Sequence, residues 1–131
     1  MKVAKAGGGG WHGTAQPHLD GIAENGICRD YNQVSRYGYG SYFARDSTYS
    51  LSPRYASPDA DGAQHLLLCR VLRGESCVGH SGMRRPDAKP GRSKLYESMV
   101  DKLDNPSIIV LSAGSDSQCY PEFLLKVKRR P

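Results

Sequence analysis

Several residue patterns that mark common functional classes are missing from this sequence. None of the four cysteines forms a C-x-x-C pair, and no cysteine and histidine have the spacing of a zinc finger. The N-terminus lacks the hydrophobic segment of a secretory signal, and no apolar run approaches the roughly 20 residues that cross a bilayer. We therefore expect no metal site, no membrane segment, and reduced thiols in a cytoplasmic or nuclear protein, although the cysteine spacing is also compatible with a disulfide.

The common motifs for phosphate binding and ester hydrolysis are missing too. Gly38 and Gly40 form a G-x-G, but no third glycine follows at the offset of a Rossmann domain and no strand–turn–helix unit surrounds the pair. The sequence contains no P-loop. Serine, histidine and aspartate are present, but no G-x-S-x-G supports a hydrolase triad. These absences exclude the Rossmann, P-loop and α/β-hydrolase classes.

The composition indicates one small globular domain. The 131 residues are 38% hydrophobic and 24% charged, and 15 glycines and 8 prolines predict many loops between short elements. Residues 1–10 end in a glycine run, which predicts a flexible lead-in and not a strand, so one domain is expected over residues 11–131. The formal net charge of +5 gathers partly at the C-terminus, where a solvated tail is the common explanation and polyanion binding the alternative.

Periodicity and turn residues predict more strands than helices. A helical stripe over 19–23 ends at Gly26, residues 28–41 form a loop, and Asp46 or Ser47 caps a short helix. The other expected elements are a buried strand over 66–72, an amphipathic helix over 94–103 with Leu95, Met99 and Leu103 on one face, a strand over 108–111, a turn over 112–117 and a closing strand over 123–127. Because strands and helices do not alternate regularly, the pattern favours an α+β fold with mainly antiparallel pairing.

Segments that are weak signals alone occur in an informative order. They are WHGT at 11–14, YGYGSYFARDSTYS at 37–50, LLLCRVLRGESCVG at 66–79, LYESMVD at 95–101, PSIIV at 106–110 and QCYPEFLL at 118–125. This succession resembles the catalytic domain of the poly(ADP-ribose) polymerase (PARP) superfamily over roughly residues 11–128, and its closing segment is similar to that of the mono-transferring branch. The resemblance implies an α+β ADP-ribosyltransferase fold. Mostly antiparallel, split β-sheets with a few short helices would surround an NAD cleft, shortened at the N-terminal side relative to the family.

The resemblance also implies the roles of individual residues toward NAD, the co-substrate. His12 would bind the adenosine ribose, and Tyr42 would pack on the nicotinamide side. The backbone of Gly13 and the hydroxyl of Ser50 would bind the nicotinamide amide, while Tyr55 would stack on the pyridinium ring. The residue types suit these roles, because a carboxamide needs one acceptor and two donors, and tyrosine faces attract a cationic ring.

The third signature residue decides the product in this family. Polymer-forming members carry a glutamate there, whereas the matching position in this sequence is Ile108, with Ile109 or Val110 as alternatives if the register slips. An aliphatic side chain cannot hydrogen-bond a ribose hydroxyl or activate it for elongation, so transfer of a single ADP-ribose unit is expected. Glu122 belongs to the later YPEF segment, and we interpret it as a solvated surface carboxylate.

The resulting hypothesis is an NAD-dependent mono-ADP-ribosyltransferase that needs no metal. A protein side chain is the expected acceptor, with a nucleic-acid end as the alternative, and a monomer is the expected state. An inactive pseudo-transferase that binds NAD or a partner and an NAD glycohydrolase remain open. A basic nucleic-acid-binding domain is disfavoured, because the tail KVKRR has no aromatic residue inside it.

Overall fold

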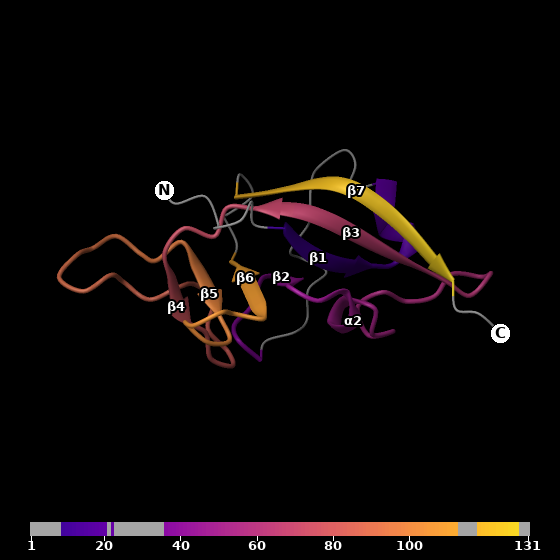
Figure 1. Ribbon diagram of the computed structural model, residues 1–131. Helices are drawn as coiled ribbons and strands as arrows, with labels where there is room; N and C mark the ends of the chain where they lie inside the picture. The colour runs from indigo at the N-terminus through magenta and orange to yellow at the C-terminus, as the bar shows by residue number, and fades with distance from the viewer. Residues whose placement is uncertain (1–8, 21, 23–35, 113–117, 129–131) are drawn as a thin grey trace.

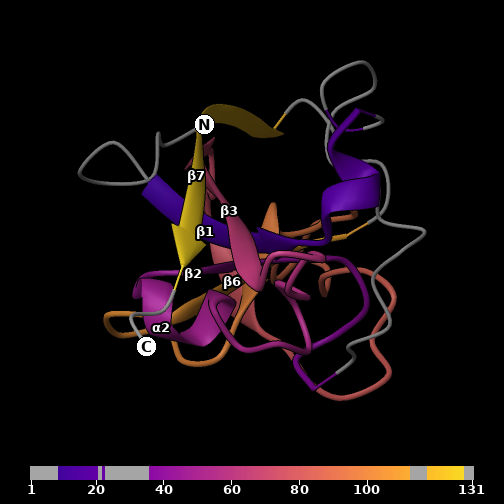
Figure 2. The ribbon, with the colours of Figure 1, turned by 90° about the vertical axis from the view of Figure 1, so that its right-hand side faces the viewer.

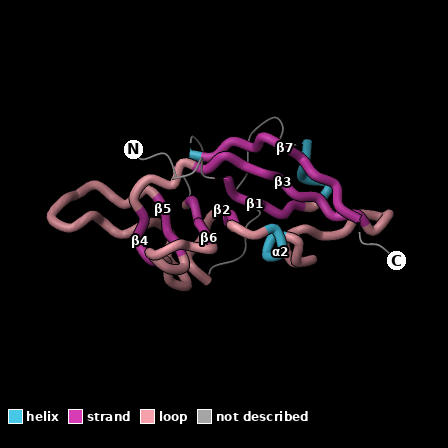
Figure 3. The backbone as a smooth tube through the Cα atoms, in the orientation of Figure 1, coloured by secondary structure: helices cyan, strands magenta, loops and turns pink. Residues whose placement is uncertain are grey.

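The computed structural model describes residues 9–20, 22, 36–112 and 118–128, which form one strand-rich sheet with very short helices (Figures 1 and 3). The strands are β1 (Gly9–Thr14), β2 (Ser41–Ala44), β3 (Ala63–Val71), β4 (Ser76–Val78), β5 (Ser98–Val100), β6 (Ile108–Leu111) and β7 (Cys119–Lys128). The helical elements include a 3-10 turn η2 (Gln16–His18) and a single-turn helix α2 (Ser47–Ser50). Leu19, Asp20 and Ile22 are also helical, within the stripe expected over 19–23. No helix of the described residues is long and apolar enough to span a bilayer.

The seven strands form one sheet in the order β4-β5-β6-β2-β1-β3-β7. Of these pairings, β4 with β5 is parallel and the others are antiparallel, which confirms the mainly antiparallel prediction. The ladder is continuous, so the two split sheets expected from the resemblance are joined here, and β1 meets β2 in register at Trp11 and Ala44. Figure 2 shows β3 and β7 running steeply across the more level β1, as expected for a twisted sheet.

Apolar, β-branched sequence explains the strands that were predicted correctly. The strand expected over 66–72 matches the C-terminal part of β3, which begins three residues earlier and ends at Val71. Residues Ala63–Leu67 of β3 are all buried, so both faces of the strand are covered there. The strands expected over 108–111 and 123–127 are β6 and the second half of β7. The short helix α2 begins after Asp46 as expected, although the Asp46 side chain makes no capping hydrogen bond.

The predicted amphipathic helix over 94–103 is wrong. Met99 is fully buried, but Leu95 is 37% exposed and Leu103 is 64% exposed, so they share no apolar face. Residues Ser98–Val100 instead form β5 between β4 and β6. The Asp101 carboxylate accepts the backbone N–H groups of Ser107 and Ile108, and this turn chemistry reverses the chain into β6 where a helix would have continued.

The prediction that the glycine run forms no strand is also wrong at Gly9 and Gly10, which are the first residues of β1. They pair with Arg70 and Cys69 of β3. A Cβ at Gly10 would lie 2.8 Å from the Cβ of Phe43, so glycine lets β1 approach the core at this point. The predicted helix end at Gly26, Cys28 and most of the predicted turn over 112–117 lie outside the described residues.

The core consists of two groups of side chains on opposite faces of β2. The first, the Tyr42 cluster, contains Tyr42, Ala44, Cys77, Met99, Ile108 and Val110, with Tyr37, Tyr49, Met83 and Tyr96 packed against it. The second, the Phe43 cluster, contains Ile22, Phe43, Leu67, Cys69, Val71 and Leu111, with Ile109 and Cys119 packed against it. Alternation of side chains along a strand produces this division.

Candidate functional site

Tyr42 is the best-anchored aromatic residue of the predicted site. Its ring is buried in the Tyr42 cluster, and its hydroxyl donates to the Gly38 carbonyl at 2.7 Å and accepts the Tyr37 N–H at 2.9 Å. Burial raises the pKa of the phenol, although the Tyr37 N–H opposes the shift. Tyr42 therefore stays neutral and ties the segment before β2 to the strand.

Tyr55 lies beside a second tyrosine that the sequence did not single out. The rings of Tyr49 and Tyr55 are stacked, with centroids 5.1 Å apart and planes 20° apart, and their hydroxyl oxygens are 3.1 Å apart. Burial and the bond to Tyr55 raise the pKa of Tyr49. Tyr49 also packs against the Tyr42 cluster, so it connects Tyr55 with Tyr42 and Ile108. A tyrosine six positions before Tyr55 gives no recognisable motif, which is why this contact was not predicted.

Gly13 and Ser50 lie under the chain that carries Tyr55. A Cβ at Gly13 would collide with the Ser50 carbonyl oxygen and come within 3.1 Å of the carbonyl carbon of Tyr55. The absence of a side chain at Gly13 thus lets the backbone of Ser50 and Tyr55 pack against β1. The Ser50 hydroxyl donates to the Trp11 carbonyl at 2.9 Å, so it must rotate away from this oxygen to donate to a ligand. The structure brings Gly13, Ser50 and Tyr55 together, as the predicted amide site requires.

His12 lies on the other face of β2. Its ring centroid is 5.4 Å from that of Phe43, and its Nδ1 is 2.9 Å from the Tyr42 carbonyl oxygen. Because a carbonyl can only accept, Nδ1 carries the proton and the neutral ring leaves Nε2 as an acceptor. Burial lowers the pKa of His12, although the bond to the Tyr42 carbonyl opposes the shift. His12 and Tyr42 are therefore linked through the backbone of β2, and their side chains point to opposite faces.

The positions proposed for the third signature residue are separated by the sheet. Ile108 lies opposite Ala44 and Val110 lies opposite Tyr42, and both belong to the Tyr42 cluster. Ile109 packs against the Phe43 cluster on the other face. Ile108 and Val110 are therefore compatible with a position beside Tyr42, whereas Ile109 is not. Glu122 is on β7, which three strands separate from β6, and it forms an ion pair with Arg70 at 3.3 Å.

No group of three or more histidine, cysteine, aspartate or glutamate side chains that could hold a metal occurs among the described residues. Cys69 and Cys77 are free thiols. Burial raises the pKa of Cys69 to about 12, so this thiol is protonated and acts as a small apolar core residue.

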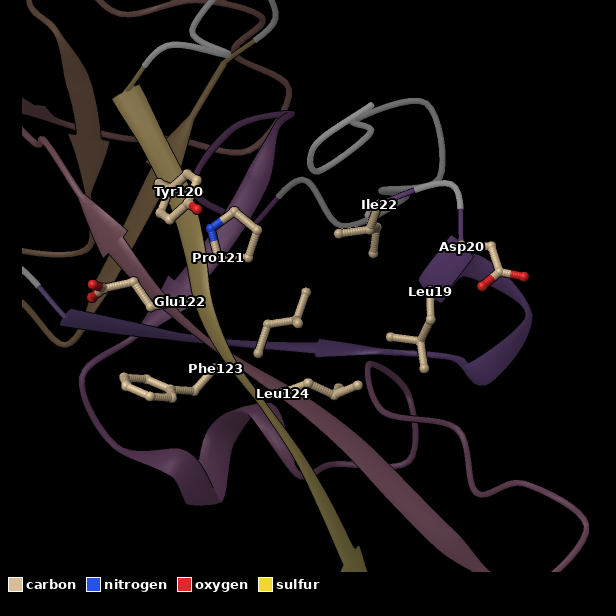
Figure 4. Close-up of a pocket in the computed structure, with 9 residues that line it drawn as sticks. Leu19, Asp20, Ile22, Tyr120, Pro121, Glu122, Phe123 and Leu124 are labelled. Carbon is tan, nitrogen blue, oxygen red and sulfur yellow. The ribbon is translucent and has the colours of Figure 1, made fainter. Parts of the chain in front are cut away.

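A cavity of about 490 Å³ lies on the Phe43 face of the sheet, between the segment after η2 and β7 (Figure 4). Its walls are Leu19, Asp20, Ile22, Leu67 and residues 120–124. None of the predicted site residues lines it. Leu67 and Ile22 also belong to the Phe43 cluster, so the cavity opens on the face of the sheet opposite to the Tyr42 cluster, against which Tyr49 packs.

Comparison with known proteins gives a consistent result. A family model described as the poly(ADP-ribose) polymerase catalytic domain matches residues 10–129. The human protein mono-ADP-ribosyltransferase PARP14 is 35% identical over 124 residues, which cover 91% of this chain and 7% of PARP14. The probable inactive poly(ADP-ribose) polymerase SRO5 of Arabidopsis thaliana is 30% identical over 120 residues, which cover 91% of this chain and 38% of SRO5. The chain thus spans well under half the length of both relatives.

A solved structure supports the fold. The crystal structure of the PARP domain of Arabidopsis RADICAL-INDUCED CELL DEATH1 matches with a TM-score of 0.75 at 21% sequence identity, covering 94% of this chain and 68% of that one. A likeness at this identity establishes the fold, and it confirms the α+β architecture predicted from the sequence.

Proposed function

The chain belongs to the poly(ADP-ribose) polymerase catalytic-domain family, and we propose that it is an NAD-dependent mono-ADP-ribosyltransferase. The observation that carries this proposal is the grouping of Gly13, Ser50 and Tyr55 beside the Tyr42 cluster, with aliphatic side chains where a polymer-forming enzyme would carry glutamate. The relative PARP14 is named as a mono-ADP-ribosyltransferase, which agrees with this assignment.

The proposed binding of NAD follows from the hydrogen-bonding capacity of the site. The backbone of Gly13 offers a donor and an acceptor, and a rotated Ser50 hydroxyl offers a second donor to the amide oxygen. The ring of Tyr55 offers a face to the pyridinium. The Nε2 of His12 is an acceptor suited to a ribose hydroxyl, so His12 would bind the nucleotide at a distance from the nicotinamide.

The proposed reaction needs little acid–base chemistry from the protein. The bond between nicotinamide and ribose breaks and nicotinamide leaves with the bonding electrons, so positive charge develops on the ribose. A nucleophilic group of the acceptor then forms a bond to the anomeric carbon; a carboxylate does so without a proton transfer, and a protonated nucleophile releases its proton to solvent. A site that fixes nicotinamide while the ribose flattens favours this step by positioning. Because Ile108 cannot activate a ribose hydroxyl, a second unit is not added.

The acceptor is proposed to be a protein side chain that is nucleophilic without a general base from the enzyme, such as a carboxylate. A nucleic-acid end would be labelled by the same chemistry and is distinguished by the assay below. The monomeric state and the location in the cytoplasm or nucleus remain predictions.

The test follows both products of the reaction. The purified chain is incubated with NAD and a cell lysate, and nicotinamide release is measured beside ADP-ribose attached to macromolecules, with nuclease and protease digestion to identify the acceptor. His12→Ala and Ser50→Ala serve as site variants. Tyr96→Phe serves as a control, because Tyr96 packs against the Tyr42 cluster without a described hydroxyl bond to the site.

Each outcome assigns one function. Single-unit labelling of protein that requires His12 and Ser50 supports the mono-transferase, and polymer ladders contradict the assignment of Ile108. Nicotinamide release without labelling indicates a glycohydrolase. Binding of NAD without turnover indicates a pseudo-transferase, an alternative that the relative SRO5, named as probably inactive, makes worth testing.

A further inference from the structure

Tyr55 sits in an irregular segment and depends on neighbouring groups for its orientation. It follows α2 in a stretch without regular structure, where its N–H donates to the Ser52 carbonyl at 2.9 Å. A half-buried tyrosine ring in such a segment loses side-chain entropy when it is fixed. Any group that holds the ring before a ligand arrives therefore improves binding by removing part of that cost.

Tyr49 contacts the Tyr55 ring directly. The two rings are stacked with centroids 5.1 Å apart and an interplanar angle of 20°, and the hydroxyl oxygens are 3.1 Å apart. The pair is therefore held by ring stacking and by a hydrogen bond between the hydroxyls. Tyr49 is itself held, because it belongs to α2 and packs against the cluster that contains Tyr42 and Ile108. Its raised pKa, caused mainly by burial, keeps the hydroxyl protonated and able to bond with Tyr55.

We propose that Tyr49 is a positioning residue that fixes the Tyr55 ring, so that a planar carboxamide ring binds on the one face of Tyr55 that Tyr49 leaves free. The inference rests on the proposed function, since the ligand ring is the nicotinamide of NAD. It assigns Tyr49 no contact with the reacting atoms. The bound state would be a stack in which Tyr55 lies between Tyr49 and the ligand.

The test uses benzamide, a planar primary carboxamide without a ribose, as the probe. Its dissociation constant is measured by calorimetry for the unmodified chain, for Tyr49→Phe, for Tyr55→Phe and for the double variant. Tyr49→Phe keeps the ring and removes only the hydroxyl bond. We expect it to weaken benzamide binding about 3- to 10-fold, the usual contribution of one such bond. Tyr55→Phe removes the same bond, so the double variant is expected to bind about as weakly as either single variant.

Control measurements separate positioning from general packing. Tyr96→Phe removes a hydroxyl from another half-buried tyrosine of the same cluster and is expected to leave benzamide affinity unchanged. The NAD kinetics of Tyr49→Phe should show a higher KM with a smaller change in kcat, while the melting temperature shifts no more than that of Tyr96→Phe. Tyr49→Leu, which also removes the stacked ring, should weaken binding further than Tyr49→Phe.

The outcomes distinguish this inference from the proposed function. If the unmodified chain binds benzamide and Tyr49→Phe binds it equally well, the positioning role is wrong and the proposed function stands. Equal losses in Tyr49→Phe and Tyr96→Phe, or additive losses in the double variant, would also overturn it. If the unmodified chain neither binds benzamide nor releases nicotinamide from NAD, the proposed function fails and the inference fails with it.

Discussion

The two faces of the four-residue strand β2 differ in the kind of contacts that their side chains make. All residues of Ser41–Ala44 are buried, yet Tyr42 and Phe43 belong to separate clusters. On the Tyr42 face, tyrosine hydroxyls are held by specific hydrogen bonds, as in the pairs Tyr42–Gly38 and Tyr49–Tyr55. On the Phe43 face, the cluster around Phe43 consists of aliphatic side chains and the buried thiol of Cys69, and the ring of His12 lies beside Phe43.

The contrast teaches that stability and ligand binding can be separated within one strand. Removing apolar volume on the Phe43 face removes buried area and packing, which support the whole sheet. Removing a hydroxyl on the Tyr42 face changes one directional contact and leaves most of the packing intact. His12 is the exception, because its side chain lies on the Phe43 face and its ring is bonded to the backbone of Tyr42.

The largest expected effect comes from the Phe43 face. Phe43→Ala should lower the free energy of unfolding by about 3–5 kcal/mol, since the ring is fully buried and its loss leaves a cavity. Urea denaturation measures this change, and Phe43→Leu, which retains most of the volume, should cost much less. A loss below about 1 kcal/mol for Phe43→Ala would mean that this face is not the stabilising one.

Next in size is the effect of adding a side chain at Gly13, where no space is available for one. Gly13→Ala should lower NAD turnover by about 100-fold, because its Cβ would displace the backbone of Ser50 and Tyr55. Gly9→Ala is the matched control in the same strand, since its Cβ would meet only the Leu68 side chain at 3.8 Å. Nicotinamide release and the melting temperature are measured together. Similar turnover in the two variants would show that the Tyr42 face is not the site.

Removing the Ser50 hydroxyl should have a more selective effect. Ser50→Ala is expected to lower NAD turnover about tenfold while the free energy of unfolding falls by only about 1 kcal/mol, the contribution of the bond to the Trp11 carbonyl. The comparison of kinetics with urea denaturation separates the two. A loss of stability that equals or exceeds the loss of transition-state binding would assign Ser50 a structural role.

The smallest expected effect is the pH dependence contributed by His12. Its folded-state pKa lies below the ordinary value of 6.5, mainly because of burial, so the unfolded chain binds more protons between the two values. The free energy of unfolding should therefore fall as the pH drops below about 6.5 and level off above it. The NMR titration of the His12 ring should have its midpoint below 6.5.

The comparison for this prediction is between the unmodified chain and His12→Gln. His12→Gln should flatten the pH dependence of the free energy of unfolding in the mildly acidic range, as measured by urea denaturation at a series of pH values. An unaltered profile in His12→Gln would show that the imidazole is not desolvated, and that the Phe43 face does not enclose it.

The sequence predicted the strands whose residues carry their own signal. The ranges 66–72 and 108–111 are apolar or β-branched apart from Arg70, and they form most of β3, up to Val71, and all of β6. The region 94–103 was misassigned because Leu95, Met99 and Leu103 imitate a helical stripe, while the deciding contacts of the Asp101 carboxylate lie with residues 107 and 108. The strand at Gly9 and Gly10 was missed because glycine carries no strand propensity and pairs here only where β3 is already in place.

By itself, the sequence determined the family and the α+β class, because the order and spacing of motifs are properties of the chain alone. The site residues His12, Gly13, Tyr42, Ser50, Tyr55 and Ile108 stay a prediction from the same motifs. The tertiary structure alone decided that Ile109 faces away from Tyr42, that His12 lies on the opposite face, and that Tyr49 stacks on Tyr55. These facts depend on strand register and ring orientation, and a change of one residue in register moves a side chain to the other face of the sheet.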